Sequence, residues 1–177
     1  MSLVTQPKYH DYVDRFEQML TNSSLLMPKT NGDLTKTDLV NQIIKYEIPI
    51  PDTPPEGPGP PHVFISVPNN PLISKVQRGR NTRDKQGPEK QTLEFYMIVV
   101  AQDPKGFQRS QIQMYTILEA ITTTLTKNLR LTDTAGLNPL AARLDYLVLP
   151  YTFQNEEKTV IAKNISVRPQ VWVDVRT

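Results

Sequence analysis

The chain has 177 residues, 38% of them hydrophobic, no cysteine, and a formal net charge of +2. This composition excludes disulfides, thiolate metal sites and cysteine nucleophiles, and a nearly neutral chain gains no general nucleic-acid affinity from bulk charge. The first residues show no basic region before an apolar run, and no apolar stretch approaches the ~20 residues that span a bilayer, so we expect neither a signal peptide nor a membrane partner.

Two helices are predicted in an N-terminal helical segment, residues 1–47. Residues 8–21 place apolar side chains three and four positions apart, which is one face of a helix. These side chains are Tyr9, Tyr12, Val13, Phe16, Met19 and Leu20. A second, short helix is predicted over residues 37–45, with an inward face of Leu39, Val40, Ile43 and Ile44.

Residues 48–62, IPIPDTPPEGPGPPH, contain seven prolines. Each proline lacks an N–H and fixes φ, so the segment forms neither a helix nor a central strand and favours extended polyproline-type chain. We interpret it as a semi-rigid strap that lies on its own subunit or reaches a neighbour. The alternative is a docking peptide for an aromatic groove. The strap leads to the core, residues 63–177, and the length fits a single domain overall.

The core is predicted to begin with a strand over residues 63–67, which Pro68 to Pro71 interrupt and Leu72, Ile73 and Val76 restart. Residues 91–102 give the strongest strand signal, and both faces become apolar toward its end, which predicts a central strand. A turn at 103–106 leads to the longest predicted helix, residues 107–130. Its apolar stripe is Met114, Ile117, Leu118, Ile121, Leu125 and Leu129.

After a loop at residues 133–139, the chain returns to strands. One is predicted over residues 144–149, extending as far as 153, and a long, interrupted last strand covers residues 159–175. Pro169 places that strand at an edge or a bulge. The whole order predicts an α+β fold: an antiparallel or mixed sheet with the long helix and the N-terminal helix packed on it.

A long loop between two strands, residues 75–90, concentrates positive charge. Six basic residues and two acids give it +4, whereas a hairpin needs only two to five connecting residues. Such a loop is either disordered or meets something negative, namely nucleic acid or an acidic neighbouring subunit. Aromatic residues do not interleave with the charges, so the pattern of a single-strand binder is weak. The candidate site residues are Lys75, Arg78, Arg80, Arg83, Lys85 and Lys90.

The sequence contains no pattern of a known active site. His10 and His62 form a metal site only if carboxylates converge on them, and no phosphate-binding loop, dinucleotide fingerprint or nucleophile elbow is present. The carboxylate pairs at 11/14 and 156/157 are typical of solvated faces. Tyr146 and Trp172 are interpreted as packing residues, with base-stacking platforms as the alternative. We therefore predict a non-enzyme with no catalytic residue, cofactor or metal. An enzyme of unrecognised type is the alternative.

The order of elements resembles the tail terminator proteins of long-tailed phages and related tailed viruses, and the similar neck or tail-completion proteins. An N-terminal amphipathic helix precedes VFISVP, a charged loop and TLEFYMIVVA. The helix FQRSQIQMYTILEAITTTL and paired strands ending in ISVRPQVWVDV follow. The resemblance covers most of residues 8–176. It rests on the order of the elements and on the general character of their sequences, without an invariant motif.

The resemblance implies a structural virion protein of the tail or neck, assembled in the host cytoplasm. Six copies would form a ring that ends the tail tube and joins it to the head-completion or connector protein. Sheets would surround a channel through which DNA passes transiently and without sequence specificity. The alternatives are a neighbouring neck or head-completion protein, and a nucleic-acid-binding module that uses the loop 75–90. Sheet edges are the expected contacts between subunits.

Overall fold

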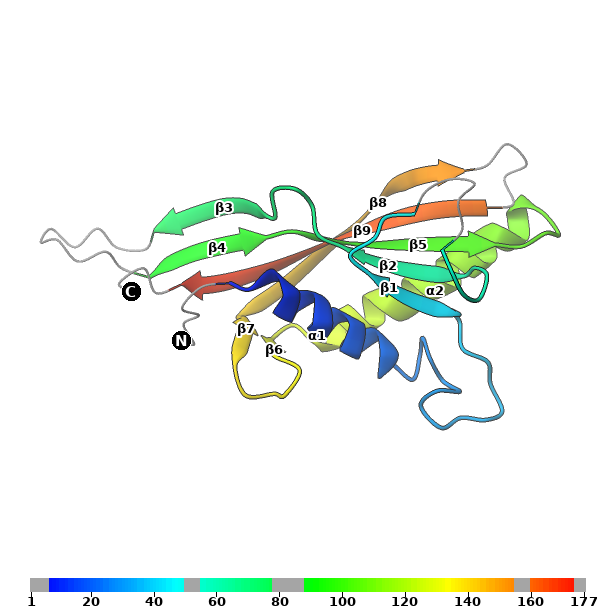
Figure 1. Cartoon of the computed structure of the whole chain (residues 1–177), viewed down its shortest axis with the longest axis horizontal. Helices are drawn as coiled ribbons and strands as arrows, with labels where there is room; N and C mark the ends of the chain where they lie inside the picture. Colours follow the sequence, from blue (N-terminus) through cyan, green and yellow to red (C-terminus); the bar gives the residue numbers. More distant parts are fainter. Residues whose placement is uncertain (1–6, 50–54, 78–87, 155–159, 174–177) are drawn as a thin grey trace, which may run out of the picture.

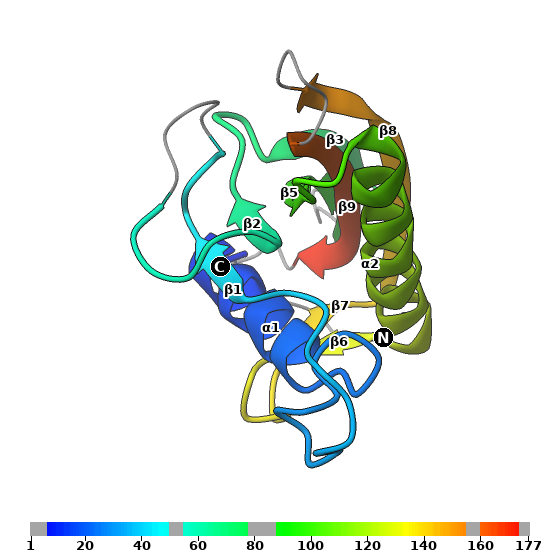
Figure 2. The ribbon, with the colours of Figure 1, turned by 90° about the vertical axis from the view of Figure 1, so that its right-hand side faces the viewer.

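Seven strands of the described residues form one sheet, and both helices pack on the same face of it (Figures 1 and 2). The computed structural model of the protein describes residues 7–49, 55–77, 88–154 and 160–173. The architecture is the predicted α+β fold. Its elements are α1 (Tyr9–Thr21), β1 (Gln42–Lys45), β2 (His62–Ser66), β3 (Leu72–Gln77), β4 (Glu89–Leu93), β5 (Phe95–Gln102), α2 (Phe107–Lys127), β6 (Leu131–Thr132), β7 (Pro139–Ala141), β8 (Arg143–Gln154) and β9 (Val160–Val173).

Strand β9 lies in the middle of the sheet. It pairs with β8 on one side, and on the other side with β5 and β4, which follow one another along it. Beyond these, β2 and then β1 extend the sheet from β5, and β3 extends it from β4. The pairing of β1 with β2 is parallel, and the other pairings in this sheet are antiparallel. The sheet therefore ends in β8 on one side and in β1 and β3 on the other.

Helix α1 docks on the sheet through an aromatic cluster centred on Phe95 of β5. The Tyr12 ring stacks on Phe95 with 5.3 Å between centroids, and the Phe16 ring meets it edge-on at 5.4 Å. All three rings are fully buried. The predicted helix over residues 8–21 is confirmed, because its apolar stripe covers the sheet as the spacing requires.

Helix α2 packs on β5, β8 and β9, as the sequence predicts for the long helix. Its β-branched threonines are poor helix formers, but their hydroxyls donate to carbonyls one turn earlier, as Thr122 does to Leu118 (2.9 Å). The helix ends at Lys127, three residues earlier than predicted. Leu129 consequently leaves the predicted buried stripe and is 51% exposed.

The predicted short helix over residues 37–45 is wrong. Residues 42–45 form β1, with Ile43 opposite Val63 and Ile44 opposite Phe64 of β2. Ile43 and Ile44 pack on different apolar clusters, one on each face of the sheet. The spacing of apolar residues from 39 to 44 fits a helix, but an edge strand with two apolar faces satisfies it equally well.

The strand predicted over residues 91–102 is interrupted at Glu94, whose N–H donates to the Pro71 carbonyl (2.7 Å). Across from this break, the pairing of β9 with β5 ends at Val167 and its pairing with β4 begins at Gln170. Pro169 therefore lies where the ladder is discontinuous, which a residue without an N–H tolerates. Of the two predicted positions, an edge or a bulge, the edge is wrong, since β9 pairs on both sides. The predicted interruptions of the strand are absent between 160 and 173.

Residues 55–61 of the strap lie on their own chain, against β1 and β2. The Asn41 amide donates to the Gly59 carbonyl (2.7 Å), and His62 Nε2 donates to the Pro58 carbonyl (2.7 Å). His62 is 1% exposed, and a buried imidazole needs such a partner. These contacts fix the end of the strap to the sheet. The division of the chain at residues 47 and 62 stays a prediction.

Replacing Tyr12 with phenylalanine is expected to weaken the fold and change its response to alkaline pH. The Tyr12 hydroxyl donates to the Leu140 carbonyl, and both groups are buried. Burial, and secondarily the Asp11 carboxylate, raises the pKa of Tyr12 above its ordinary value of 10.0. The unfolded chain then releases a proton above that pH that the folded chain keeps, so stability falls as pH rises.

Chemical denaturation of both proteins at neutral pH and at about pH 11 measures this effect. Tyr12→Phe should lose about 1–3 kcal/mol at neutral pH, because the Leu140 carbonyl is left without its donor. Its stability should then decline less than that of the wild type on going to the alkaline condition. Equal declines in the two proteins would contradict this role for Tyr12.

Candidate assembly surface

The face of the sheet opposite α1 and α2 is called the helix-free face, because neither helix of the described residues packs on it (Figure 2). Its apolar part is a second, smaller cluster of buried side chains. Phe64 of β2, Ile98 and Val100 of β5 and Ala162 of β9 are each at most 6% exposed. This confirms the prediction that the strongest strand is central and covered on both sides.

A polar cluster interrupts the helix-free face at the break between β4 and β5. Arg168 Nη2 lies 3.1 Å from Glu94 Oε1, and the Ser166 hydroxyl donates to the same oxygen. Tyr96 donates to the other carboxylate oxygen at 3.3 Å, and burial followed by the Glu94 charge raises the pKa of Tyr96. The Glu94 side chain is 14% exposed and that of Arg168 is 39% exposed, so Arg168 is the more accessible member.

The β8 edge, residues 143–149, carries exposed aliphatic side chains. Leu147 is 52% and Val148 is 37% exposed. Beyond Val148 the register with β9 shifts twice, so the regular part of this edge lies before Pro150. A regular edge strand with exposed aliphatic residues is a ready template for pairing with another chain.

The β3 edge, residues 72–77, lies on the opposite side of the sheet and has the same character. Ile73 is 44% and Val76 is 57% exposed. The neighbouring edge strand β1 is shorter, with four residues, and the next residue, Tyr46, lies in the left-handed region with φ of 65°. The β3 and β8 edges are therefore the two better candidates for contacts between subunits.

The structure places two of the six candidate basic residues in strands instead of the predicted loop. Lys75 belongs to β3 and Lys90 to β4, and the connection between these antiparallel strands spans residues 78–88. The remaining candidates Arg78, Arg80, Arg83 and Lys85 lie outside the described residues. The strands confirm a hairpin here, but the predicted loop boundaries at 75 and 90 are wrong.

Lys75 and Lys90 do not share a surface. Lys75 lies opposite Gln91 and Lys90 opposite Val76, which puts their side chains on different faces of the hairpin. Lys75 Nζ also lies 3.7 Å from the Glu89 carboxylate, which accepts a further bond from Gln91 (2.7 Å). The base of the hairpin therefore forms no combined basic patch from these two residues.

Several of the described acidic residues hold structural contacts. Asp14 and Glu17 of α1 bind Lys45 of β1 at 2.9 and 2.8 Å, and these two contacts, Glu17 first, raise the pKa of Lys45. Asp103 accepts the Lys105 N–H (2.8 Å), which confirms the predicted turn there. Asp145 binds Arg143 (2.8 Å) and Gln170 (2.6 Å) on its own chain.

Within the described residues, no group of three or more histidine, cysteine or acidic side chains is placed to hold a metal ion. His10 lies beside Asp11 on α1, whereas His62 is buried on β2 and bound to the strap. Neither described helix has the length and apolar composition to cross a membrane. The most distinctive features of the described surface are thus the two sheet edges and the helix-free face.

The comparisons with known proteins do not assign this chain to a family. No protein-family model matches the sequence, and no curated protein matches it. Among solved structures, the fold is similar to a chain of one described as "Virion of native gene transfer agent (GTA) particle". The sequences are 14% identical, the TM-score is 0.44, and the match covers 93% of this chain and 96% of that chain. A likeness this distant carries no argument about function.

Proposed function

We propose that this chain is a structural virion protein, a tail terminator whose copies form a ring, and that it has no enzymatic activity. The observation that carries the proposal is the pair of opposite sheet edges, β3 and β8, each with exposed aliphatic residues. Two different edges that fit one another give a head-to-tail contact, and such contacts close into rings when the rotation permits. The resemblance in element order supports the same reading.

The strand directions support a ring of this kind. Three antiparallel pairings connect β8, β9, β4 and β3, so β8 and β3 run in opposite directions. If neighbouring subunits are related by rotation about an axis along the strands, the β3 edge of one meets the β8 edge of the next in antiparallel orientation. An antiparallel junction continues the pattern of the sheet itself.

In this arrangement the sheets form a wall with the helices on its outer side and the helix-free face toward the channel. Arg168 and Lys90, both on β-strands of that face, would then be cations near passing DNA. The contact would be transient and unspecific. The tail tube protein and the head-completion or connector protein would stack on the two ends of a ring of six.

Two alternative functions are less well supported than this proposal. A neighbouring neck or head-completion protein would use the same ring geometry at a different level of the connector, and its partner would be the portal-side ring. The nucleic-acid-binding module gains no support from the described residues, because Lys75 is paired with Glu89 and does not face the same way as Lys90.

Electron microscopy of the purified protein, alone and mixed with tail tubes, tests the proposal. We expect rings in solution or rings capping one end of each tube. Particles that stay monomeric in both samples would refute the tail terminator role. Rings that bind an isolated head connector but leave tail tubes uncapped would favour the neighbouring neck protein.

A further inference from the structure

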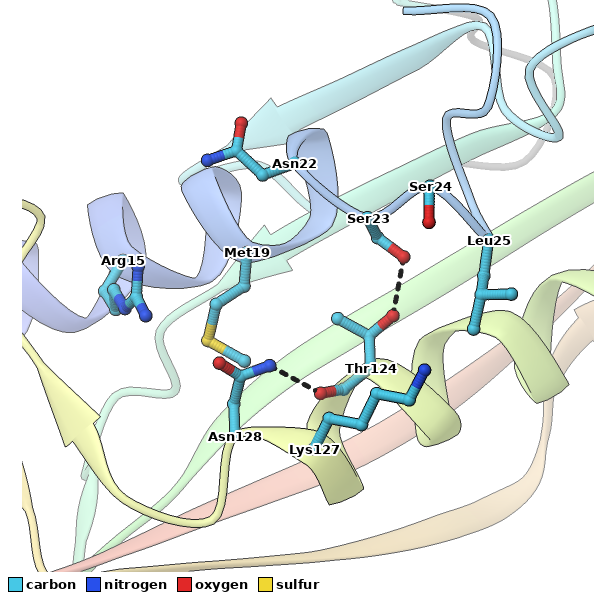
Figure 3. Close-up of a pocket in the computed structure, with 9 residues that line it drawn as sticks. All are labelled: Arg15, Met19, Asn22, Ser23, Ser24, Leu25, Thr124, Lys127 and Asn128. Atoms are coloured by element: carbon cyan, nitrogen blue, oxygen red, sulfur yellow. Dashed lines mark hydrogen bonds between the residues drawn. The ribbon is translucent and has the colours of Figure 1, made fainter. Parts of the chain in front are cut away.

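A polar hollow of about 320 Å³ lies between the C-terminal ends of the two helices, far along the chain from the loop 75–90 (Figure 3). Its walls come from α1, from the turn that follows α1, and from the last turn of α2. They contain two cationic residues and no carboxylate. The residues that line it are Arg15, Met19, Asn22, Ser23, Ser24, Leu25, Thr124, Lys127 and Asn128.

The two hydroxyls at the base of the hollow are already engaged. Thr124 donates to the Ala120 carbonyl (2.8 Å), so Ser23 is the donor in its 2.7 Å bond to Thr124. The Ser23 oxygen in turn accepts the Leu26 N–H (3.3 Å). Ser23 and Thr124 are 7% and 6% exposed. This pair joins the two helices and leaves ligand binding to the other side chains.

Hydrogen-bond donors exceed acceptors among those other side chains. Arg15 Nε is buried and has no hydrogen-bond partner in the described part of the chain, where Arg15 Nη1 donates to the neutral side chain of Gln18. Lys127 contributes an ammonium group that forms no ion pair with a described residue. An unsatisfied buried donor on a charged group is costly and calls for an acceptor.

The balance of charge favours an anion in spite of the helix ends. Each helix C-terminus contributes roughly −0.5 charge, about −1 for the two together. Arg15 and Lys127 contribute two positive charges, so the hollow stays positive. Asparagine side chains also cap carbonyls of both helix ends: Asn31 donates to Thr21 and Asn128 to Thr124, each at 2.8 Å.

We propose that this hollow binds an oxyanion, a carboxylate or a phosphate group, between Arg15 and Lys127. Figure 3 shows the two side chains coming from different helices, with Met19 and Asn128 between them. The Lys127 ammonium group points away from Arg15, toward Leu25, and reaches an anion at Arg15 by rotating about its side-chain bonds. Arg15 Nε supplies the directional hydrogen bond and Lys127 the mobile charge. Charge-assisted bonds of this kind are the strong ones in anion recognition. The proposal is independent of ring formation.

Nuclear magnetic resonance of the wild-type protein reads the site directly, because the Nε–H group of arginine gives its own ¹H–¹⁵N signal. The probes are inorganic phosphate and acetate in separate titrations, with chloride at matched ionic strength as the reference. We expect the Arg15 Nε–H signal to shift and saturate with one or both probes. The probe that binds more tightly identifies the anion class.

Arg15→Gln and Lys127→Gln should each raise the Kd of the tighter probe about tenfold or more, as expected for one lost charge-assisted bond. Lys105→Gln removes an exposed cation in the turn before α2 and should leave the Kd unchanged. Equal weakening by Lys105→Gln would reduce the effect to general surface charge and overturn the site. An Arg15 signal that responds to phosphate and acetate no more than to chloride would overturn it as well.

Discussion

Lysine at both sheet edges, Val76→Lys with Leu147→Lys, is expected to abolish ring assembly while leaving the subunit folded. Val76 and Leu147 are more than half exposed in the single subunit, so the substitutions disturb no core. Surface changes of this type usually alter stability by about 0.5 kcal/mol or less. At an edge, however, a lysine must be desolvated before a second strand can pair, which is how natural edges avoid association.

Sizing by light scattering gives the readout, with thermal unfolding as the check on folding. The double variant should run as a monomer with an unfolding temperature close to that of the wild-type subunit. Leu137→Lys is the matched control, because Leu137 is 80% exposed in the turn between β6 and β7, away from both edges. Rings that persist in the double variant, or that are lost equally in the control, would contradict the edge contact.

The largest expected effect on stability comes from Phe95→Ala. Phe95 is fully buried and contacts the rings of Tyr9, Tyr12 and Phe16, so its loss leaves a cavity between α1 and β5. Truncations of buried phenylalanine cost about 3–5 kcal/mol. Domains of this size are stable by only about 5–15 kcal/mol, so the variant should be close to unfolding.

Urea denaturation of the isolated subunit measures this loss. Phe95→Leu is the appropriate comparison, since it keeps much of the apolar volume and should cost about 1.5 kcal/mol or less. If Phe95→Ala lowered the free energy of unfolding no more than Phe95→Leu, the packing of α1 on the sheet would not depend on this ring.

Periodicity predicted those elements whose apolar residues lie on one face, and α1 and α2 are the clearest cases. Periodicity failed for β1, because Ile43 and Ile44 pack on opposite faces of the sheet. The strand that pairs with β1, β2, lies twenty residues further along the chain. Periodicity also missed the break at Glu94, because buried residues keep the same alternation from β4 into β5. The break shows only in the contacts of the folded chain, namely the bond from Glu94 to Pro71 and the gap in the pairing with β9. Both errors reflect partners distant in sequence.

The candidate surface was predictable only in its general character. An edge contact was expected, yet the sequence did not identify β3 and β8 as the opposite edges, since edge position depends on the whole strand order. The cluster of Glu94, Ser166 and Arg168 was missed because its members lie 72 and 74 residues apart. A glutamate within an otherwise apolar strand was the one local signal for it.

The central claim is that one subunit joins the next through β3 and β8, and site-directed cross-linking tests it most directly. The chain has no cysteine, so a variant with Val76→Cys and Leu147→Cys carries only the two thiols that are introduced. Strands tilt and stagger when sheets close into a ring, and a short flexible bismaleimide tolerates that offset. The double variant should give a ladder of covalent oligomers that stops at the ring, and each single variant should give none. Dimers from a single variant, or no ladder from the double variant, would contradict the account.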